Sequence, residues 1–517
     1  MMSVLPAATA VILALSVLLG GATRQGYLGD VVVQIAACFL VGLTLWASCE
    51  PGRRFRLDPL GKAMLAVAGI LCLVQLLPIF PGLGVKTLSI PDVAGGTLTV
   101  SHSWWSRISL TPMVTWAGMT SALVPVAVFM AVTQCDAAGR VLLWRVILGL
   151  GGLALLLGVL QMLQGMGSSL RFYAITNSQS SVGFFANRNH FAAQLYVTLA
   201  FSGAWIATTG RQIIQKGAFR DRGALMMGGG IAFLLLLTAG LAMTNSRAGL
   251  LIAMGTVLGI GAMTMLSPTQ ERGTRSRGRG TRIILLLLFL VVLLVAQLSL
   301  HQIIGRFQAD VAEDLRWPLS LATFGAAFSA LPFGTGIGSF VRIYGAIEDP
   351  AHLTSEYANR AHNDLAEFLL ETGILGGALV VLFLIWFGRH ALAAWLAKQG
   401  EQDGFQRALQ RAATLAIAGL LLHALVDYGL RTTALSALFA VACGFLTRVP
   451  PPVTQHSRSA PVHRKKAPAS YSPKVASMPP PPLPPSPSEP RPAWGEGVTW
   501  PEEWKPASGA PPKPRGE

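Results

Sequence analysis

Residues 283–300 read IILLLLFLVVLLVAQLSL and contain no charged side chain. A second uncharged run, MVTWAGMTSALVPVAVFMAVTQ, covers residues 113–134. Apolar runs of about 18 or more residues match the roughly 30 Å hydrocarbon core of a bilayer. Because lipid offers no hydrogen-bond partners, each run should form a helix that satisfies its own backbone groups. These two stretches therefore predict an integral membrane protein.

The composition of the whole chain supports the same fold class. Of its 517 residues, 52% are hydrophobic and only 12% are charged, whereas a soluble domain carries about 25% charged residues. The pattern predicts an all-α, polytopic membrane protein with about twelve transmembrane helices. The predicted helix cores are residues 5–22, 30–49, 62–80, 113–134, 144–163, 189–208, 226–243, 249–266, 283–300, 370–388, 412–428 and 432–447.

Lys and Arg residues gather in alternate loops, such as 53–62, 211–222 and 272–282. Basic loops stay on the cytosolic side of a membrane, so both termini are predicted to be cytosolic. The opposite loops, including the long one at 301–369, then face the periplasm of a bacterial inner membrane. The net charge of +16 does not predict a nucleic-acid partner, because membrane topology already explains where the basic residues lie.

The last part of the chain, residues 449–517, has a different composition and includes PPPPLPPSPSEPRP at 479–492. Proline removes backbone donors and favours extended, disordered chain. We predict a transmembrane domain at 1–448 followed by a disordered, basic, Pro-rich cytosolic tail. The tail is either a plain extension or a docking segment for a cytosolic, proline-reading partner or for membrane lipids.

Arg247 lies in TNSRAG, a short outward turn at 244–249 between two predicted helices. Arg316 also lies on the predicted outward side, against the usual bias of basic residues. An arginine at the membrane boundary either extends to lipid headgroups or binds an anion. Phosphate suits the second role because the guanidinium group can bind it through two parallel hydrogen bonds.

The long loop at 301–369 contains the turn GTGIG at 334–338 and then His362 and Asn363. The glycines predict a tight turn or a close backbone approach to a ligand. Asp364, Glu367 and Glu371 recur at spacings of three and four and so share one helix face. That face is either a solvated acidic surface or part of a site in which His362 acts as a base near neutral pH.

His423 and Asp427 stand four residues apart in LLHALVDYGLR, residues 421–431. In a helix they point the same way, and ionisable residues within a membrane often mark a functional site. A buried structural contact between them is an equal alternative. The histidines and cysteines show no metal-ligand spacing, so no metal site is predicted.

Four patches together resemble the O-antigen ligase family of membrane glycosyltransferases, which also includes polysaccharide polymerases. They are GFFANRNHFAAQL at 183–195, TNSRAG, the outward loop ending in AHNDLAEFLLETGILG at 361–376, and LLHALVDYGLR. The resemblance is strongest over residues 180–447.

The resemblance implies a glycan donor carried on polyprenyl diphosphate and an acceptor hydroxyl on lipid A–core or another glycan. It implies no metal, no nucleotide sugar and no other cofactor. His362 is the expected catalytic base, and Arg247 and Arg316 are expected to bind the diphosphate. Asn363, Asp364, Glu367, His423 and Asp427 are expected to support them, with Asp364 or Glu367 orienting the imidazole of His362. A single displacement would invert the anomeric centre.

Other functions remain open at this stage. Within the family, the chain is a ligase, a repeat-unit polymerase or an enzyme that glycosylates protein, and only the acceptor separates these. Outside it, a secondary transporter fits the number of helices, but the two halves of the sequence show no related pattern. A non-catalytic membrane scaffold would leave the outward arginines and His362 without a role.

Overall fold

The computed structural model describes residues 4–24, 26–49, 58–77, 87–91, 97–101, 107–210, 222–266, 316–348, 358–396 and 404–450, with a few isolated positions between them. The predicted span at 283–300 and the Pro-rich tail beyond residue 450 lie almost wholly outside these ranges. Each of the other predicted spans overlaps an observed helix.

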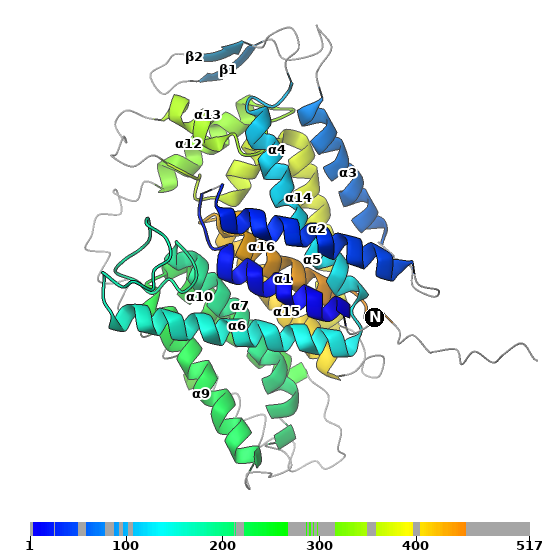
Figure 1. The fold of residues 1–517 in the computed structure, drawn as a ribbon, viewed down its shortest axis with the longest axis vertical. Coiled ribbons are helices and arrows are strands. Elements are labelled where there is room, and N and C mark those ends of the chain that lie inside the picture. Colours follow the sequence, from blue (N-terminus) through cyan, green and yellow to red (C-terminus); the bar gives the residue numbers. More distant parts are fainter. Residues whose placement is uncertain are drawn as a thin grey trace, which may run out of the picture. The chain divides into compact units, whose positions relative to one another are not determined.

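The described chain is almost entirely helical, which confirms the all-α fold class (Figure 1). Its helices are α1 (Val4–Leu19), α2 (Leu28–Ser48), α3 (Pro59–Leu76), α4 (Pro112–Ser121), α5 (Leu123–Gln134), α6 (Ala137–Leu163), α7 (Arg188–Trp205), α9 (Arg222–Met243), α10 (Arg247–Leu266), α12 (Arg316–Ser329), α13 (Phe340–Ile347), α14 (Asp364–Leu396), α15 (Gly404–Ala424) and α16 (Thr433–Leu446). A π turn, η1 (Ile206–Gly210), extends α7, and a 3₁₀ turn, η4 (Gly429–Arg431), precedes α16.

One small hairpin was not predicted. Strands β1 (Thr87–Pro91) and β2 (Thr97–Ser101) pair antiparallel, with Thr87 opposite Ser101. They lie between α3 and α4.

Within the described ranges, eight helices are long and apolar enough to cross a membrane. Helices α1 and α16 are apolar but shorter. The structure therefore establishes a polytopic membrane protein, while the number twelve stays a prediction.

Polar side chains at the helix starts explain several boundaries. The carboxylate of Asp58 accepts from the backbone N–H of Gly61 at the start of α3, and Asp136 accepts from Gly139 at the start of α6. The side chain of Asn187 accepts from the N–H of Asn189 at the start of α7. Each cap satisfies a backbone donor that has no partner inside the helix.

Helix α7 forms the centre of the fold. Every residue from Asn189 to Ala204 is buried, and α6, α9, α10, α15 and α16 pack around it (Figure 1). Helix α3 is the opposite case, because its large apolar side chains, such as Leu65 and Leu73, are exposed. Such exposed faces suit contact with lipid tails, whereas the buried helix can carry polar groups.

The GTGIG turn approaches the protein's own backbone. A Cβ on Gly334 would lie 2.6 Å from the carbonyl carbon of Glu371, and the N–H of Gly336 donates to the carbonyl of Glu371 at 2.9 Å. Opposite them, α14 is interrupted at Gly373, whose φ is 58°. Of the two expectations for these glycines, the structure shows the tight turn, which packs against the backbone of α14 at Glu371.

Candidate active site

Three segments far apart in the sequence meet near the start of α14. The loop that ends at His362 leads into α14, the residues Asp427 and Tyr428 follow α15, and Asn189 and His190 stand in the first turn of α7. The other side chains surround the buried carboxylate of Asp427.

The carboxylate of Asp427 is 1% exposed and faces polar groups on several sides. Its Oδ1 atom lies 3.3 Å from Nδ1 of His362 and 4.0 Å from Nε2 of His190. Oδ1 also accepts from the backbone N–H of Tyr428 at 2.9 Å, and Oδ2 accepts from the side-chain amide of Asn189. A buried carboxylate held on so many sides has a fixed position.

The electrostatic surroundings keep Asp427 ionised. Burial raises the pKa of the Asp427 carboxyl, but the contact with His362 and the interactions with His190 and Arg316 lower it more. The pKa of Asp427 therefore lies well below its ordinary value. A permanent negative charge faces the imidazole of His362.

His362 has an unusual backbone and a partly open side chain. Its φ is 50°, in the left-handed region that residues with a Cβ seldom adopt. Its side chain is 23% exposed, and its ring meets the ring of Tyr428 edge-on at 4.9 Å. Strained, non-glycine backbone of this kind persists where the surroundings enforce it and is frequent at active sites.

The orientation of His362 defines its chemistry. With Nδ1 toward the carboxylate of Asp427, a proton on Nδ1 is favoured, and Nε2 is left as the basic nitrogen. A carboxylate that holds a histidine in this tautomer is a common arrangement for general-base catalysis.

The expected partner of His362 was therefore wrong. We expected Asp364 or Glu367 to orient the imidazole, but both carboxylates contact arginines. Arg360 donates from Nη1 to Glu367 at 2.8 Å, and Nε of Arg431 donates to Asp364 at 3.3 Å. Sequence proximity was misleading, because Glu367 accepts from Arg360 and from the N–H of Ala361, and Asp364 accepts from Arg431.

The acidic face of α14 is buried and is not a solvated surface. Glu371 is 0% exposed and accepts from Nη1 of Arg431 at 2.7 Å. Burial lowers the pKa of Arg431, but the charges of Glu371, Glu367 and Asp364 raise it above its ordinary value. This group of three carboxylates and two arginines, here called the acidic cluster, joins α14 to the segment before α16.

Asn363 and His423 have supporting positions. Asn363 accepts from the N–H of Ala366 at 3.0 Å and donates to Ser320 of α12 at 3.0 Å, so it caps α14 and ties it to α12. His423 lies in the last turn of α15, with Nδ1 3.3 Å from the hydroxyl of Tyr196. Helix α15 ends at Ala424, so Asp427 follows the helix, although its N–H still donates to the carbonyl of His423 at 2.9 Å.

The two arginines expected to bind diphosphate occupy the first positions of two helices. Arg247 begins α10 and is exposed, and Arg316 begins α12 and is half-buried. The charge of Arg316 contributes to lowering the pKa of Asp427, which puts it within electrostatic reach of that carboxylate.

Two further arginines near the TNSRAG turn were not assigned from the sequence. The hydroxyl of Ser180 accepts from Nδ2 of Asn245 at 3.2 Å and from Nη1 of Arg188 at 3.4 Å. Nη1 of Arg171 donates to the carbonyl of Ser180 at 2.9 Å. The turn before Arg247 is thereby joined to the loop that carries Arg171 and to Arg188 at the start of α7.

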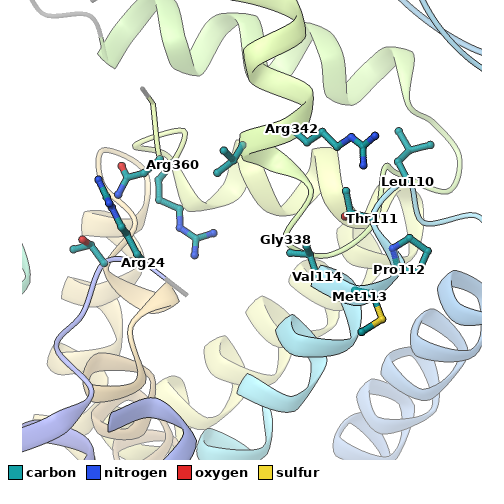
Figure 2. Close-up of a pocket in the computed structure, with 12 residues that line it drawn as sticks. Arg24, Leu110, Thr111, Pro112, Met113, Val114, Gly338, Arg342 and Arg360 are labelled. Carbon is teal, nitrogen blue, oxygen red and sulfur yellow. The ribbon is translucent and has the colours of Figure 1, made fainter. Parts of the chain in front are cut away.

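A cavity of about 580 Å³ lies beside the loop that leads to His362. Arg24 and Arg360 border one end of it, and Arg342 and Leu110 border the other (Figure 2). Asn359, which precedes Arg360, also lines it.

Residues 232–381 match the O-antigen ligase family. Over these residues the chain is similar to O-antigen ligases. No curated protein matches the chain. The family match and the apolar helices of the chain together indicate a bacterial membrane protein with a membrane glycosyltransferase-like function.

The matched range contains only part of the site. Arg247, Arg316, His362 and the three carboxylates of the acidic cluster lie inside residues 232–381. His190 and Asp427 lie outside them, as does Arg431. The matched range is narrower than the predicted 180–447, yet the remaining segments complete the surroundings of His362.

Sequence reasoning also missed Asn189 and His190. Both stand in GFFANRNHFAAQL, one of the four patches that carried the resemblance. A histidine and an asparagine at the start of a predicted membrane helix were the available signal, because polar groups there need partners.

Proposed function

We propose that the chain transfers a glycan from a polyprenyl-diphosphate carrier to an acceptor hydroxyl, as an O-antigen ligase-like enzyme. The observation that carries this proposal is the pair formed by His362 and the buried, ionised Asp427, beside Arg316 and within a family of membrane glycosyltransferases. The family match supports the general reaction, and the pair supplies a base for it.

His362 is the general base in this proposal. Its Nδ1 faces Asp427, so Nε2 accepts the proton of the acceptor hydroxyl as the oxygen attacks the anomeric carbon. The imidazolium that forms is stabilised by the carboxylate of Asp427. Because Asp427 is held by Asn189 and by the N–H of Tyr428, little reorganisation is needed during the reaction.

The leaving diphosphate requires cations. As the bond between the anomeric carbon and the diphosphate oxygen breaks, the electron pair and the negative charge pass to the diphosphate. Arg247 and Arg316 are proposed to bind that charge through their guanidinium groups. The reaction is a single displacement: one C–O bond forms as another breaks, and the configuration at the anomeric carbon is inverted.

The proposed setting is the periplasmic face of the inner membrane, with both termini in the cytosol. The donor is then delivered by the membrane itself, and the acceptor is lipid A–core or a growing glycan. The nature of the acceptor separates a ligase from a repeat-unit polymerase.

The test is deletion of the gene in its host, followed by electrophoresis of the surface glycans. Complementation uses the wild type, His362→Ala and the matched control His390→Ala, a histidine of α14 whose Nδ1 lies 2.9 Å from the carbonyl of Trp386. We expect the wild type and His390→Ala to restore the glycan and His362→Ala to fail while its membrane level is unchanged.

The electrophoretic pattern of the surface glycans in the deletion strain identifies the reaction. Bare lipid A–core with accumulated long lipid-linked glycan indicates a ligase, and core that carries a single repeat unit indicates a polymerase. Unchanged lipopolysaccharide, secreted polysaccharide and glycoprotein would reject the glycosyltransferase proposal in favour of transport or a scaffold.

A further inference from the structure

The cavity beside the site is strongly basic. Arg24, Arg342 and Arg360 line it, and among the described residues that line it none is acidic. The three arginines come from separate segments, namely the loop after α1, helix α13 and the loop before α14. Their combined positive field favours an anionic occupant.

The three arginines differ in how firmly they are held. Arg360 is buried, and its Nη1 donates to Glu367. Arg342 is exposed and makes no side-chain hydrogen bond or ion pair with the described part of the chain. An arginine without a protein carboxylate at the wall of a cavity is suited to bind an anion from outside.

Much of the remaining wall is apolar. Leu110, Pro112, Met113 and Val114 lie at the start of α4 (Figure 2). Val341 of α13 also lines the cavity and is 44% exposed. An occupant that suits both walls is an amphiphile with an anionic group. Phosphate fits the arginines best, since its several oxygens can accept from guanidinium groups in different directions.

The cavity is connected to the proposed base. Arg360 and Asn359 line it and precede His362 by only two and three residues. The side chain of Asn359 forms a hydrogen bond with Tyr428. The ring of Tyr428 contacts the ring of His362. A molecule bound in the cavity is therefore placed near His362 without occupying the positions of Arg247 and Arg316.

We propose that this cavity is the acceptor subsite and that it binds a phosphate group on a membrane-borne acceptor. This inference rests on the proposed function, because it assigns the second substrate of that reaction. Arg24 and Arg342 bind the phosphate, and Arg360, fixed by Glu367, orients the bound molecule toward His362.

The test measures the charge and occupancy of the cavity without any glycosyl transfer. The full chain in phosphatidylcholine nanodiscs carries Val341→Cys, and Cys38, Cys49 and Cys72 are replaced by Ala, while the buried Cys135 and Cys443 are retained. We compare the rates at which an anionic and a cationic methanethiosulfonate reagent modify the introduced thiol. Each rate is divided by the rate at which the same reagent reacts with free 2-mercaptoethanol. Val114→Cys gives a second reporter on the other wall if Val341→Cys does not fold.

We expect the anionic reagent to be favoured by roughly tenfold or more, and Arg342→Gln or Arg24→Gln to reduce that preference by about fivefold each. Arg145→Gln, which removes an exposed arginine of α6, is the matched control and should leave the preference unchanged. Glucose 6-phosphate should slow the reaction, whereas glucose should not. Equal rates for the two reagents, or equal protection by the two sugars, would overturn the phosphate site.

Two further arms address the source of the phosphate. If phosphatidylglycerol nanodiscs by themselves block the reaction, the cavity is a site for bulk anionic lipid and the acceptor assignment is wrong. In a transfer assay, Arg342→Gln should raise KM for a phosphorylated acceptor several-fold and leave KM for its dephosphorylated form unchanged; equal effects on both would also reject it. Because the labelling needs no donor, its result stands even if the host experiment rejects glycosyl transfer.

Discussion

Two neighbouring buried groups of charged residues differ in the kind of partner that neutralises them. In the acidic cluster, Glu367 and Glu371 pair with Arg360 and Arg431, which remain positively charged at every accessible pH. Asp427 instead faces the imidazole rings of His362 and His190, side chains that can gain and lose a proton. We infer that the carboxylates of the acidic cluster serve the fold, whereas titratable partners around the fixed carboxylate of Asp427 serve proton transfer.

The largest expected effect concerns Asp427. Asp427→Asn keeps the shape of the side chain but removes the charge that holds His362 in its basic tautomer. We expect kcat to fall by about 10³-fold, with little change in KM for the donor.

The pH dependence of stability provides the control for Asp427→Asn. Because the pKa of Asp427 is depressed in the folded chain, its stabilising contribution is complete above the unfolded pKa and is lost as pH falls through the folded pKa. The difference in Tm between wild type and Asp427→Asn should be constant from pH 8 to about pH 4 and shrink only below it. A difference that disappears between pH 7 and 5 would contradict the assignment of a permanently ionised Asp427.

The second effect concerns the acidic cluster. Glu367→Ala leaves the buried Arg360 without its carboxylate partner, and it leaves the N–H of Ala361 without a hydrogen-bond acceptor. We expect a loss of about 3–5 kcal/mol in the free energy of unfolding, measured as a lower Tm and a lower membrane level. If Glu367→Ala is as stable as the wild type but inactive, the distinction between the two groups fails.

The smallest effect tests the turn that positions the start of α14. At Gly334, φ is 75° and a Cβ would meet the backbone of Glu371. Gly334→Ala should destabilise the protein by about 1–3 kcal/mol. The matched control is Gly325→Ala in α12, where a Cβ meets nothing within 4 Å, and it should stabilise by about 0.5–1 kcal/mol. Equal Tm changes for both variants would argue against a tight contact at the turn.

Hydropathy predicted most of the helices because membrane spans are a local property of the chain. The spacing of Asp364, Glu367 and Glu371 also predicted correctly that they share a face, since helical periodicity is local too. What that face contacts was predicted incorrectly. Arg431 lies 60 residues after Glu371 along the chain, and no local pattern reports such a pairing.

The sequence by itself determined the membrane character, the helical fold class and the choice of His362, Arg247 and Arg316 as candidate residues. Only the tertiary structure decided that Asp427 faces His362, that α14 carries a buried acidic cluster, and that Arg24, Arg342 and Arg360 line one cavity. The physical reason is that hydrophobicity and helical periodicity are written in consecutive residues. The pairing of charges across helices depends instead on how the packed helices bring distant residues together.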